Sequence, residues 1–446
     1  MNASQSSGGS SASKLQTEFN ALLVKYQQPA VKGGGFFGGQ QAPQLPQIEP
    51  LAIDTLKLIL EEAVRMQASD VHVEPLEQFL RVRFRLDGLL MELLRIPRAL
   101  DMRLVSLLRV NCGLDPEQGI ATGKPQDGRM AVTVDGEEAD LRLSTFPTAC
   151  GDKAVLRVIP RHKAIPKLEE LGLRPAVLDA LRHIIARPQG MILVSGPSGC
   201  GKSTTLYTML QTLNQATRNI VTLEDPIELK IEGITQGAVQ SRIGFTFSEG
   251  LRSILRQDPN VIMVGEIRDR ETSEIAMSAA LTGHLLFTTL HTNSALGAVA
   301  RLLDMGLEPF LISSALTSVI AQRLARRLCT QCREPAAAQS QALALAEKVA
   351  QRSGFSIPQN FFKTLYRAKG CSACRQTGFN GRILLFELVQ LSAALRQGIL
   401  RKASIDEMRR TAAAEGMETI IMDGLHKVAA GLTTVEEVIR VAGVED

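Results

Sequence analysis

The chain has 446 residues, of which 45% are hydrophobic and 22% charged, and its formal net charge is +4. This composition is typical of soluble domains, roughly two to four at this length, and so slight a charge argues neither for nor against a nucleic-acid partner. We expect no signal peptide and no bilayer-spanning run of about eighteen apolar residues, hence a cytoplasmic protein whose seven cysteines form no disulfide framework.

Residues 1–50 are predicted to be a short helix on a flexible tether. In KLQTEFNALLVKYQ the apolar residues fall on one helical face: Leu15, Phe19, Leu22, Leu23 and Tyr26. The following GGGFFGGQQAPQLPQ is too rich in glycine, glutamine and proline to pack. A lone amphipathic helix cannot bury its own apolar stripe, so we expect it to dock either on the main body of the chain or on a partner.

Residues 51–160 are predicted to form an α+β, PAS-like domain. The segment LAIDTLKLILEEAVRMQ has the pattern of an amphipathic helix, and VHVEP, FLRVRFRLDGLLMEL, RMAVTVDGEEADLRLST and KAVLRVIP alternate as half-buried strands do. The turn signals Asp87–Gly88 and Asp135–Gly136 predict hairpins. Residues 161–175, rich in proline, lysine and arginine, are expected to be a linker.

Residues 176–328 are predicted to be an α/β domain with a parallel sheet, because helices alternate there with the short apolar strands MILVS, NIVTLE, NVIMVGE and HLLFTTLH. The first strand runs into a glycine-rich loop and a helix, as a phosphate-binding P-loop requires. Lys202 would reach the β- and γ-phosphates and Ser203 would bind Mg²⁺. A chance glycine-rich turn is the alternative, which the flanking strand and helix disfavour. The predicted nucleotide-binding residues are Gly196, Pro197, Ser198, Gly199, Cys200, Gly201, Lys202, Ser203 and Thr204.

Cys200 occupies a position inside this loop where backbone amides and a helix N-terminus favour anions. If solvent reaches the thiol, its pKa is expected to be lowered, so that alkylation would inactivate the enzyme and ATP would protect it. The alternative is that a small residue is tolerated there for its size.

Polar residues also follow the later strands of this domain. Glu224 and Glu228 come after NIVTL, Glu266 comes after VIMVG, and the last strand is flanked by His284 and His291. A single carboxylate at a strand end is more often a capping or surface residue, but two after successive strands beyond a P-loop favour catalysis.

Four cysteines predict a zinc site. Cys329-x-x-Cys332 is followed after 38 residues by Cys371-x-x-Cys374, which is the spacing of a tetrahedral Cys₄ centre. Four thiolates leave no open coordination position, so its role would be structural. A redox pair is the alternative, but the flanking sequence is no thioredoxin-like βαβ unit. We expect a zinc-binding subdomain over residues 329–385 and a helical one over 386–446.

GPSGCGKSTTLY, LEDPIE, GLRSILRQDPNVIMVGEIRD and TGHLLFTTLHTNSA resemble, in order, the Walker A, Asp box, Walker B and His box of the secretion ATPase superfamily. These are the RecA-like hexameric motors of type II secretion and type IV pilus assembly. The resemblance also includes ASDVHVEP, RFRLDGLL, DGRM, LRLST, GFNGRILLFEL and GLTTVEEVIRVAG, and extends over roughly 390 of the 446 residues.

The resemblance implies roles for the polar residues. Glu224 would activate water, Glu266 would support the Mg²⁺ shell, and His284 and His291 would be γ-phosphate and relay elements. For each histidine the alternative is a strand-terminal residue bonded to backbone. The family also delivers arginines to the nucleotide; those that match are Arg142 and Arg157 in the first domain and Arg252 and Arg256 in the ATPase domain. Taken singly, each arginine would be read as a solvated surface charge.

The resemblance therefore implies a Mg²⁺-dependent ATPase at the cytoplasmic side of the inner membrane. It would form a homo-hexamer and drive a platform protein that extrudes a pilus or pseudopilus. The tetracysteine insertion is typical of the assembly and secretion branch, and retraction ATPases usually lack it. Residues 1–50 do not match the family's usual folded N-terminal domain, so we expect their helix to bind a recruitment protein instead.

Two other functions were considered. A nucleic-acid motor, such as a helicase or DNA pump on the same core, is disfavoured by the slight net charge and by the lack of aromatics clustered with Lys and Arg. A non-hydrolysing nucleotide-gated scaffold would lack Glu224 or Glu266, and both are present.

Overall fold

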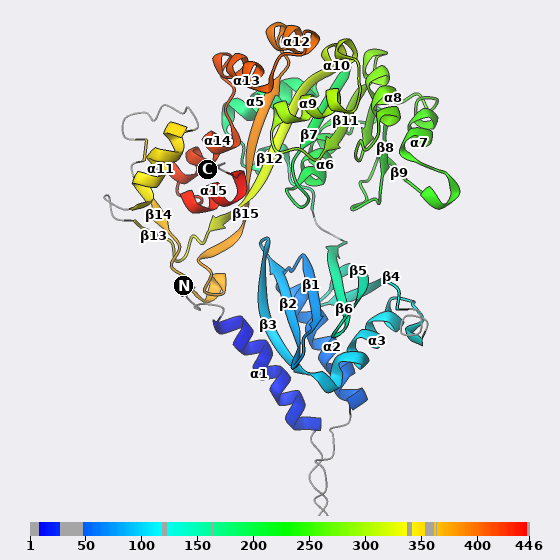
Figure 1. Cartoon of the computed structure of the whole chain (residues 1–446), viewed down its shortest axis with the longest axis vertical. Coiled ribbons are helices and arrows are strands. Elements are labelled where there is room, and N and C mark those ends of the chain that lie inside the picture. Colours follow the sequence, from blue (N-terminus) through cyan, green and yellow to red (C-terminus); the bar gives the residue numbers. More distant parts are fainter. Residues whose placement is uncertain are drawn as a thin grey trace, which may run out of the picture. The chain divides into compact units, whose positions relative to one another are not determined.

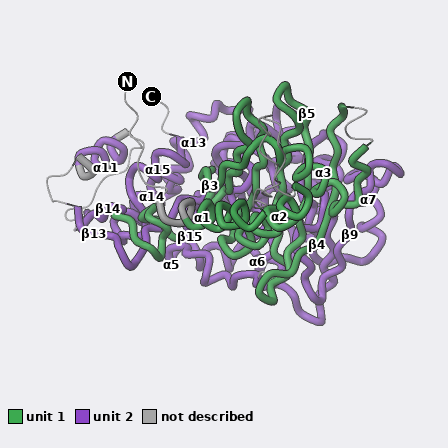
Figure 2. The backbone as a smooth tube through the Cα atoms, turned by 90° about the horizontal axis from the view of Figure 1, so that it is seen from below, with its two compact units in different colours: residues 1–163, 369–380 green, residues 164–368, 381–446 purple. Residues whose placement is uncertain are grey.

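The computed structural model describes residues 9–26, 48–117, 123–161, 164–336, 341–352, 361–362 and 364–443. The chain divides into two compact units, drawn in different colours in Figure 2. Unit 1 comprises residues 1–163 and 369–380, and unit 2 comprises residues 164–368 and 381–446. The whole of the predicted tether, residues 33–47, lies outside the described residues. No described helix is long and apolar enough to cross a membrane.

Unit 1 is built on a six-stranded antiparallel sheet with the strand order β3-β2-β1-β6-β5-β4. The strands are β1 (Asp70–Pro75), β2 (Phe79–Leu86), β3 (Leu89–Pro97), β4 (Gln126–Val134), β5 (Glu137–Thr148) and β6 (Gly151–Pro160). The predicted hairpin turns are present: Asp87 and Gly88 have φ values of 47° and 89°, and Asp135 and Gly136 have 52° and 86°. These left-handed conformations match the right-handed twist of the flanking strands.

The helices of unit 1 are α1 (Gly9–Tyr26), α2 (Ile48–Arg65), η1 (Arg98–Leu100) and α3 (Asp101–Asn111). In β2, Leu80, Val82 and Phe84 are fully buried with the apolar residues of α2 and α3. Because strand side chains alternate, Arg81, Arg83 and Arg85 lie on the opposite face of the sheet. One face of the sheet therefore holds the core and the other is charged.

Helix α1 packs on unit 1 itself, against α2 and β3. Leu15 and Phe19 are 1% and 0% exposed, within the same core as the sheet. The Tyr26 hydroxyl donates to Asp54 Oδ2 at 2.7 Å, which fixes the end of α1 to α2. Of the two expected docking sites, the main body is the correct one. The central side chains of the stripe are thus covered by unit 1, and binding of a recruitment protein by this helix stays a prediction.

Unit 2 contains a seven-stranded sheet with the order β15-β12-β7-β11-β10-β8-β9 (Figure 1). Its strands are β7 (Gly190–Ser195), β8 (Ile220–Glu224), β9 (Thr235–Ala238), β10 (Val261–Val264), β11 (Leu285–Leu290), β12 (Leu316–Leu328) and β15 (Phe379–Gln390). The six strands from β12 to β9 run parallel. The predicted parallel sheet is thereby confirmed.

Helices cover both faces of this sheet. The helices of unit 2 are α5 (Pro175–Ile185), α6 (Lys202–Leu213), α7 (Phe247–Ile254), α8 (Arg270–Leu281), α9 (Ala295–Asp304), α10 (Pro309–Ala315), α11 (Gln341–Arg352), α12 (Ala393–Leu400), α13 (Ile405–Ala414), α14 (Ile420–Ala429) and α15 (Val435–Ala442). Met191 and Leu193 of β7 pack with α7, α8 and α9, while Ile192 and Val194 pack with α5 and α6. Burial on both faces explains why these strands are continuous apolar runs.

Unit 2 also contains the shorter elements η2 (Leu168–Leu171), η3 (Ser241–Ile243), β13 (Glu334–Pro335) and β14 (Tyr366–Arg367). The short helix η4 (Ser372–Cys374) lies in the segment of residues 369–380, which belongs to unit 1. The segment predicted to be a linker is ordered where η2 buries Leu168 against the core around α6. Residues 168–171 are therefore packed into the hydrophobic core of unit 2.

Candidate nucleotide-binding site and cysteine cluster

The P-loop joins β7 to α6, and its backbone requires glycine. Gly196, Gly199 and Gly201 have φ values of 151°, 76° and 91°, which side chains disfavour. A Cβ on Gly196 would lie 2.5 Å from Cys200 Sγ and 2.6 Å from the Gln322 carbonyl oxygen. Helix α6 begins at Lys202, so its free N–H groups and positive end lie at the loop. The loop has the backbone geometry of an anion site.

Lys202 folds back over the loop that precedes it. Its ammonium donates to the carbonyl oxygens of Gly196 at 2.7 Å and Pro197 at 3.1 Å. Burial lowers the pKa of Lys202, and the nearby Glu266 charge opposes that shift. The lysine is therefore held at the P-loop, close to the acidic residue that follows β10.

Cys200 is 4% exposed, and β12 covers the loop from behind, where Gln322 Nε2 donates to the Cys200 carbonyl at 2.9 Å. Burial raises the pKa of the thiol, and the charges of Lys202 and Arg323 do not overcome it. The lowered pKa was predicted for a thiol that solvent reaches, and in this structure solvent does not reach it. The thiol fills the space beside Gly196, which supports the alternative that a small residue is tolerated for its size.

Glu224, at the end of β8, is 4% exposed and fully engaged. Its carboxylate accepts hydrogen bonds from the Tyr207 hydroxyl of α6, from Thr222 Oγ1 at 2.6 Å and from Gln236 Nε2 at 3.0 Å. Burial raises the pKa of Tyr207, and the Glu224 charge adds to that shift. Three neutral donors fix this carboxylate between α6, β8 and β9.

Glu266, which follows β10, contacts one of the two predicted histidines and a nearby arginine. His291 Nε2 lies 3.6 Å from Glu266 Oε2, and Arg268 is hydrogen-bonded to Glu266 Oε1. Arg268 also lies 3.6 Å from Asp225 Oδ2. The carboxyl ends of the parallel strands β8, β10 and β11 thus meet beside the P-loop lysine. Sequence reasoning missed Arg268, although it stands two residues after Glu266.

The two histidines lie at opposite ends of β11. His284 precedes the strand, and its Nδ1 lies 3.0 Å from the Ala279 carbonyl oxygen. His291 follows the strand, about 20 Å along it by the rise of a β-strand. Only His291 joins Glu266, and the predicted γ-phosphate role does not fit His284. His284 instead contacts a backbone carbonyl, as the alternative interpretation of the histidines expected.

Arg252 of α7 and Arg256, two residues beyond its end, make local contacts. Arg252 donates to Glu271 Oε1 of α8 at 3.0 Å, and Arg256 donates to the Arg252 carbonyl at 2.9 Å. The Arg252 side chain is 57% exposed. In this structure both arginines therefore belong to the surface of α7 and α8.

Arg142 and Arg157 lie in a row of charged residues across the sheet of unit 1. They are cross-strand neighbours on β5 and β6, and the register continues through Asp70 of β1. The same row holds Arg129 on β4 and Arg85 on β2. Arg157 Nε donates to Asp70 Oδ1 at 3.3 Å. The two predicted arginines thus belong to a row of five charged residues, four of them arginines, on the face away from the core.

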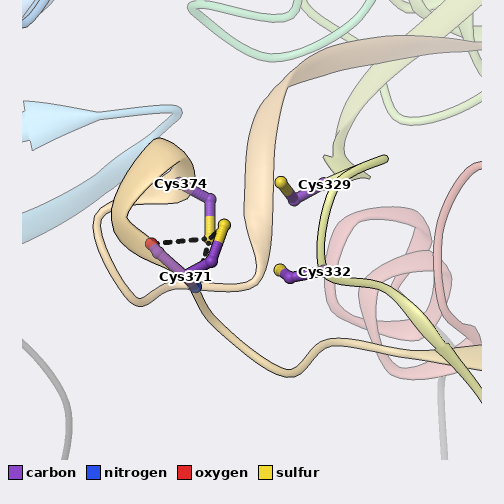
Figure 3. A group of neighbouring side chains, drawn as sticks. All are labelled: Cys329, Cys332, Cys371 and Cys374. Carbon is purple, nitrogen blue, oxygen red and sulfur yellow. Dashed lines mark hydrogen bonds between the residues drawn. The ribbon is translucent and has the colours of Figure 1, made fainter.

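The four cysteines form one cluster: a ligand sulfur from each of Cys329, Cys332, Cys371 and Cys374 lies within 4.8 Å of the others. Figure 3 shows the two pairs approaching from two segments of the chain. The sulfurs of Cys371 and Cys374 are 3.7 Å apart, and a tetrahedral site with Zn–S bonds of about 2.3 Å requires about 3.8 Å.

Backbone N–H groups also point at this cluster. Those of Cys371 and Gly378 donate to Cys374 Sγ at 3.1 and 3.2 Å. Such donors stabilise a thiolate, the form that binds zinc. The residues present fit the predicted Cys₄ zinc site in number, spacing and chemistry.

Comparisons with known proteins agree with the sequence motifs. A family model described as type II/IV secretion system protein matches residues 47–440. Type II secretion system protein E of Pseudomonas aeruginosa is 46% identical over 418 residues, which are 92% of this chain and 80% of that protein. Type II secretion system ATPase E of Vibrio cholerae is also 46% identical, over 90% of this chain and 78% of that protein.

A solved structure described as the pilus retraction motor PilT with bound ADP is similar to this chain. Its TM-score is 0.58 at 27% identity, over 87% of this chain and 97% of that one. The expected RecA-like α/β fold is confirmed by this likeness, and the resemblance to the secretion ATPases by the relatives above. The chain belongs to the family of type II/IV secretion system proteins.

Proposed function

We propose that this chain is a Mg²⁺-dependent ATPase that works as a homo-hexamer on the cytoplasmic side of the inner membrane. It would act on an inner-membrane platform protein to assemble a type II secretion pseudopilus or a type IV pilus. The observation that carries the proposal is that the P-loop, His291 and Glu266 follow the adjacent parallel strands β7, β11 and β10 at one edge of the sheet, where His291 lies 3.6 Å from Glu266. The high identity to type II secretion proteins supports the secretion branch.

In the proposed reaction the loop amides and the N-terminus of α6 bind the phosphates, and Lys202 balances their charge. Ser203 and Glu266 would hold Mg²⁺, which supplies positive charge at the β- and γ-phosphate oxygens. Glu266, next to His291, is also the carboxylate available to orient the attacking water. Glu224 was expected in that role, but its three donors favour a positioning role instead.

Further groups act around this centre in the proposal. Arg142 and Arg157 would reach the γ-phosphate of the same or a neighbouring subunit when the first domain closes, adding charge that speeds hydrolysis. The four cysteines would hold one Zn²⁺ in a structural role, since no coordination position is left for a substrate. A nucleic-acid motor predicts DNA-stimulated hydrolysis, and no feature of the described site favours it.

Steady-state ATP hydrolysis and nucleotide affinity, measured on the same variants, test the proposal. Glu266→Gln should retain ATP binding and lose a hundredfold or more of kcat, on the order of what a positioned acid or base contributes. Lys202→Ala should weaken binding itself. Glu274→Gln is the matched control, because Glu274 pairs with Arg270 on the exposed surface of α8. A kcat for Glu266→Gln equal to that of the wild type would refute the proposed site.

Subunit assembly and arginine delivery have their own tests. Light scattering with a non-hydrolysable ATP analogue should report a mass of six chains. Arg142→Ala and Arg157→Ala should each bind ATP normally and lose most turnover. Wild-type rates in both would mean that the first domain does not contribute to hydrolysis. DNA-stimulated turnover would favour the nucleic-acid motor.

A further inference from the structure

The loop of residues 291–294, which joins β11 to α9, is held by buried polar groups from three other strands. From β7, Ser195 Oγ donates to the Thr292 carbonyl at 3.0 Å and accepts from the Thr292 N–H at 3.2 Å. The next residue, Asn293, is bound by Arg323 of β12, and Ala295 is bound by Glu387 of β15. This loop begins with His291, the histidine beside Glu266.

Arg323 binds the loop at Asn293. Its NH2 group donates to both the carbonyl oxygen and Oδ1 of Asn293, at 2.9 and 3.1 Å, and its NH1 group donates to the Gln322 carbonyl. The residue is only 6% exposed, and burial lowers the pKa of the guanidinium from a very high value. Desolvating a guanidinium costs several kcal/mol. Packing alone does not require such a residue at this position.

Glu387 binds the residue that directly follows the loop, Ala295. It is 5% exposed, and its Oε1 accepts from the N–H of Ala295, the first residue of α9, at 2.8 Å. Its Oε2 accepts from the N–H of Ile420, the first residue of α14, at 3.3 Å. One carboxylate therefore serves the positive ends of two helices.

These helices do not need Glu387 in order to begin. Ser294 Oγ already accepts from the Gly297 N–H at the start of α9, and Thr419 Oγ1 accepts from the Met422 N–H at the start of α14. Such side chains are the usual helix caps. Glu387 instead links three elements: it lies on β15 and binds both the start of α14 and the end of the loop that carries His291.

We propose that Glu387 and Arg323 are positioning residues that hold the His291 loop at two successive points, Ala295 and Asn293, so that the imidazole stays beside Glu266. Neither residue acts on the nucleotide directly; both act through His291. The inference rests on the proposed function, in which Glu266 and His291 form part of the hydrolytic centre. Loosening either contact should leave nucleotide binding intact and slow the chemical step.

The test compares four full-length proteins: the wild type, Glu387→Gln, His291→Ala and the double variant. In Glu387→Gln the amide can accept only one of the two N–H groups and opposes the other with a donor. We expect kcat to fall about tenfold, the effect of losing one hydrogen bond to a charged group, with KM and ATP affinity within twofold. In the His291→Ala background the same change should cause no further loss, because residues that act as a unit are not additive.

A matched control separates positioning from stability. Asp423 of α14 is 2% exposed and accepts from the N–H of Phe386, the residue before Glu387, at 2.9 Å. Asp423→Asn disturbs the same β15–α14 contact without touching the loop. Asp423→Asn should lower the melting temperature. His291→Ala should lower kcat by the same factor in the Asp423→Asn background as in the wild type.

The second variant, Arg323→Lys, keeps a cation but loses the two-point contact with Asn293. If Glu387→Gln does not fold, Arg323→Lys replaces it in the same comparison of wild type, single variants and the double variant with His291→Ala. Losses that multiply in both double variants, or a normal kcat in both single ones, would overturn the inference. A normal kcat in His291→Ala would instead refute the proposed role of His291, on which the inference rests.

Discussion

Glu74 is the acidic centre of the charged face of unit 1, and its pKa makes a sharp prediction. The residue is 5% exposed on β1, and its carboxylate lies 2.8 Å from Arg83, 3.0 Å from Lys153 and 2.9 Å from Arg81. Burial alone would raise the pKa of this carboxyl, but the hydrogen bonds from these three cations outweigh it and lower the pKa from 4.5 to about 2.

The magnitude follows from that shift. Each pKa unit corresponds to about 1.4 kcal/mol, so the carboxylate contributes up to about 3 kcal/mol to the stability of unit 1. Because the pKa in the folded state is the lower one, this contribution is complete above about pH 4.5. It is lost as the pH falls towards 2, and about 2 kcal/mol of it is gone at pH 3.

The perturbation is Glu74→Gln, which keeps the shape and removes the charge. Hydrogen exchange followed by mass spectrometry, on peptides from β1 and β2 of the full chain, measures the local opening free energy. At pH 7 the variant should be less protected by about 3 kcal/mol, and at pH 3 by only about 1 kcal/mol. Glu92→Gln on β3 is the control, since Glu92 makes only a surface pair with Arg95. A difference that is equal at both pH values would refute the reasoning.

The other predictions concern cysteines and the first helix. Purified protein should contain about one zinc per chain, and Cys371→Ser should release it while ATP affinity stays normal; iron, or no metal with full activity, would contradict the assignment. Alkylation of the folded apo protein should be slower at buried Cys200 than at Cys150, which is partly exposed; equal rates by peptide mapping would count against burial. Phe19→Ala should destabilise unit 1 by about 3–5 kcal/mol, whereas Val24→Ala, at a 68% exposed position, should be nearly neutral in thermal unfolding.

The P-loop and the parallel sheet were predictable because their signals are local. A strand, glycines at fixed spacing and a following helix are adjacent in the chain, and the positive φ of Gly199 or Gly201 follows from neighbouring geometry. Strands that are buried on both faces of a sheet consist of continuous apolar residues, so the central strands of unit 2 are recognisable in the sequence. The Cys₄ spacing was likewise sufficient, since zinc coordination fixes which thiols must meet.

The positions of the two histidines could also have been read from the sequence. A strand of six residues separates His284 from His291, so only the second can lie at the carboxyl edge of a parallel sheet. The family resemblance implied the same kind of role for both histidines, whereas the direction of β11 places them at opposite edges of the sheet.

What the sequence could not determine depends on residues that are distant in the chain. The sequence leaves open whether solvent reaches Cys200, and the thiol is buried beneath a loop that Gln322, 122 residues later, binds. In the sequence Glu224 is a carboxylate at the end of a strand. Its burial depends on Tyr207 of α6 and Gln236 of β9, which donate hydrogen bonds to it. The sequence by itself determined which residues form the glycine-rich loop and which four cysteines lie together. Only the tertiary structure decided which side chains are buried and already bonded, because desolvation is a property of the packed neighbours.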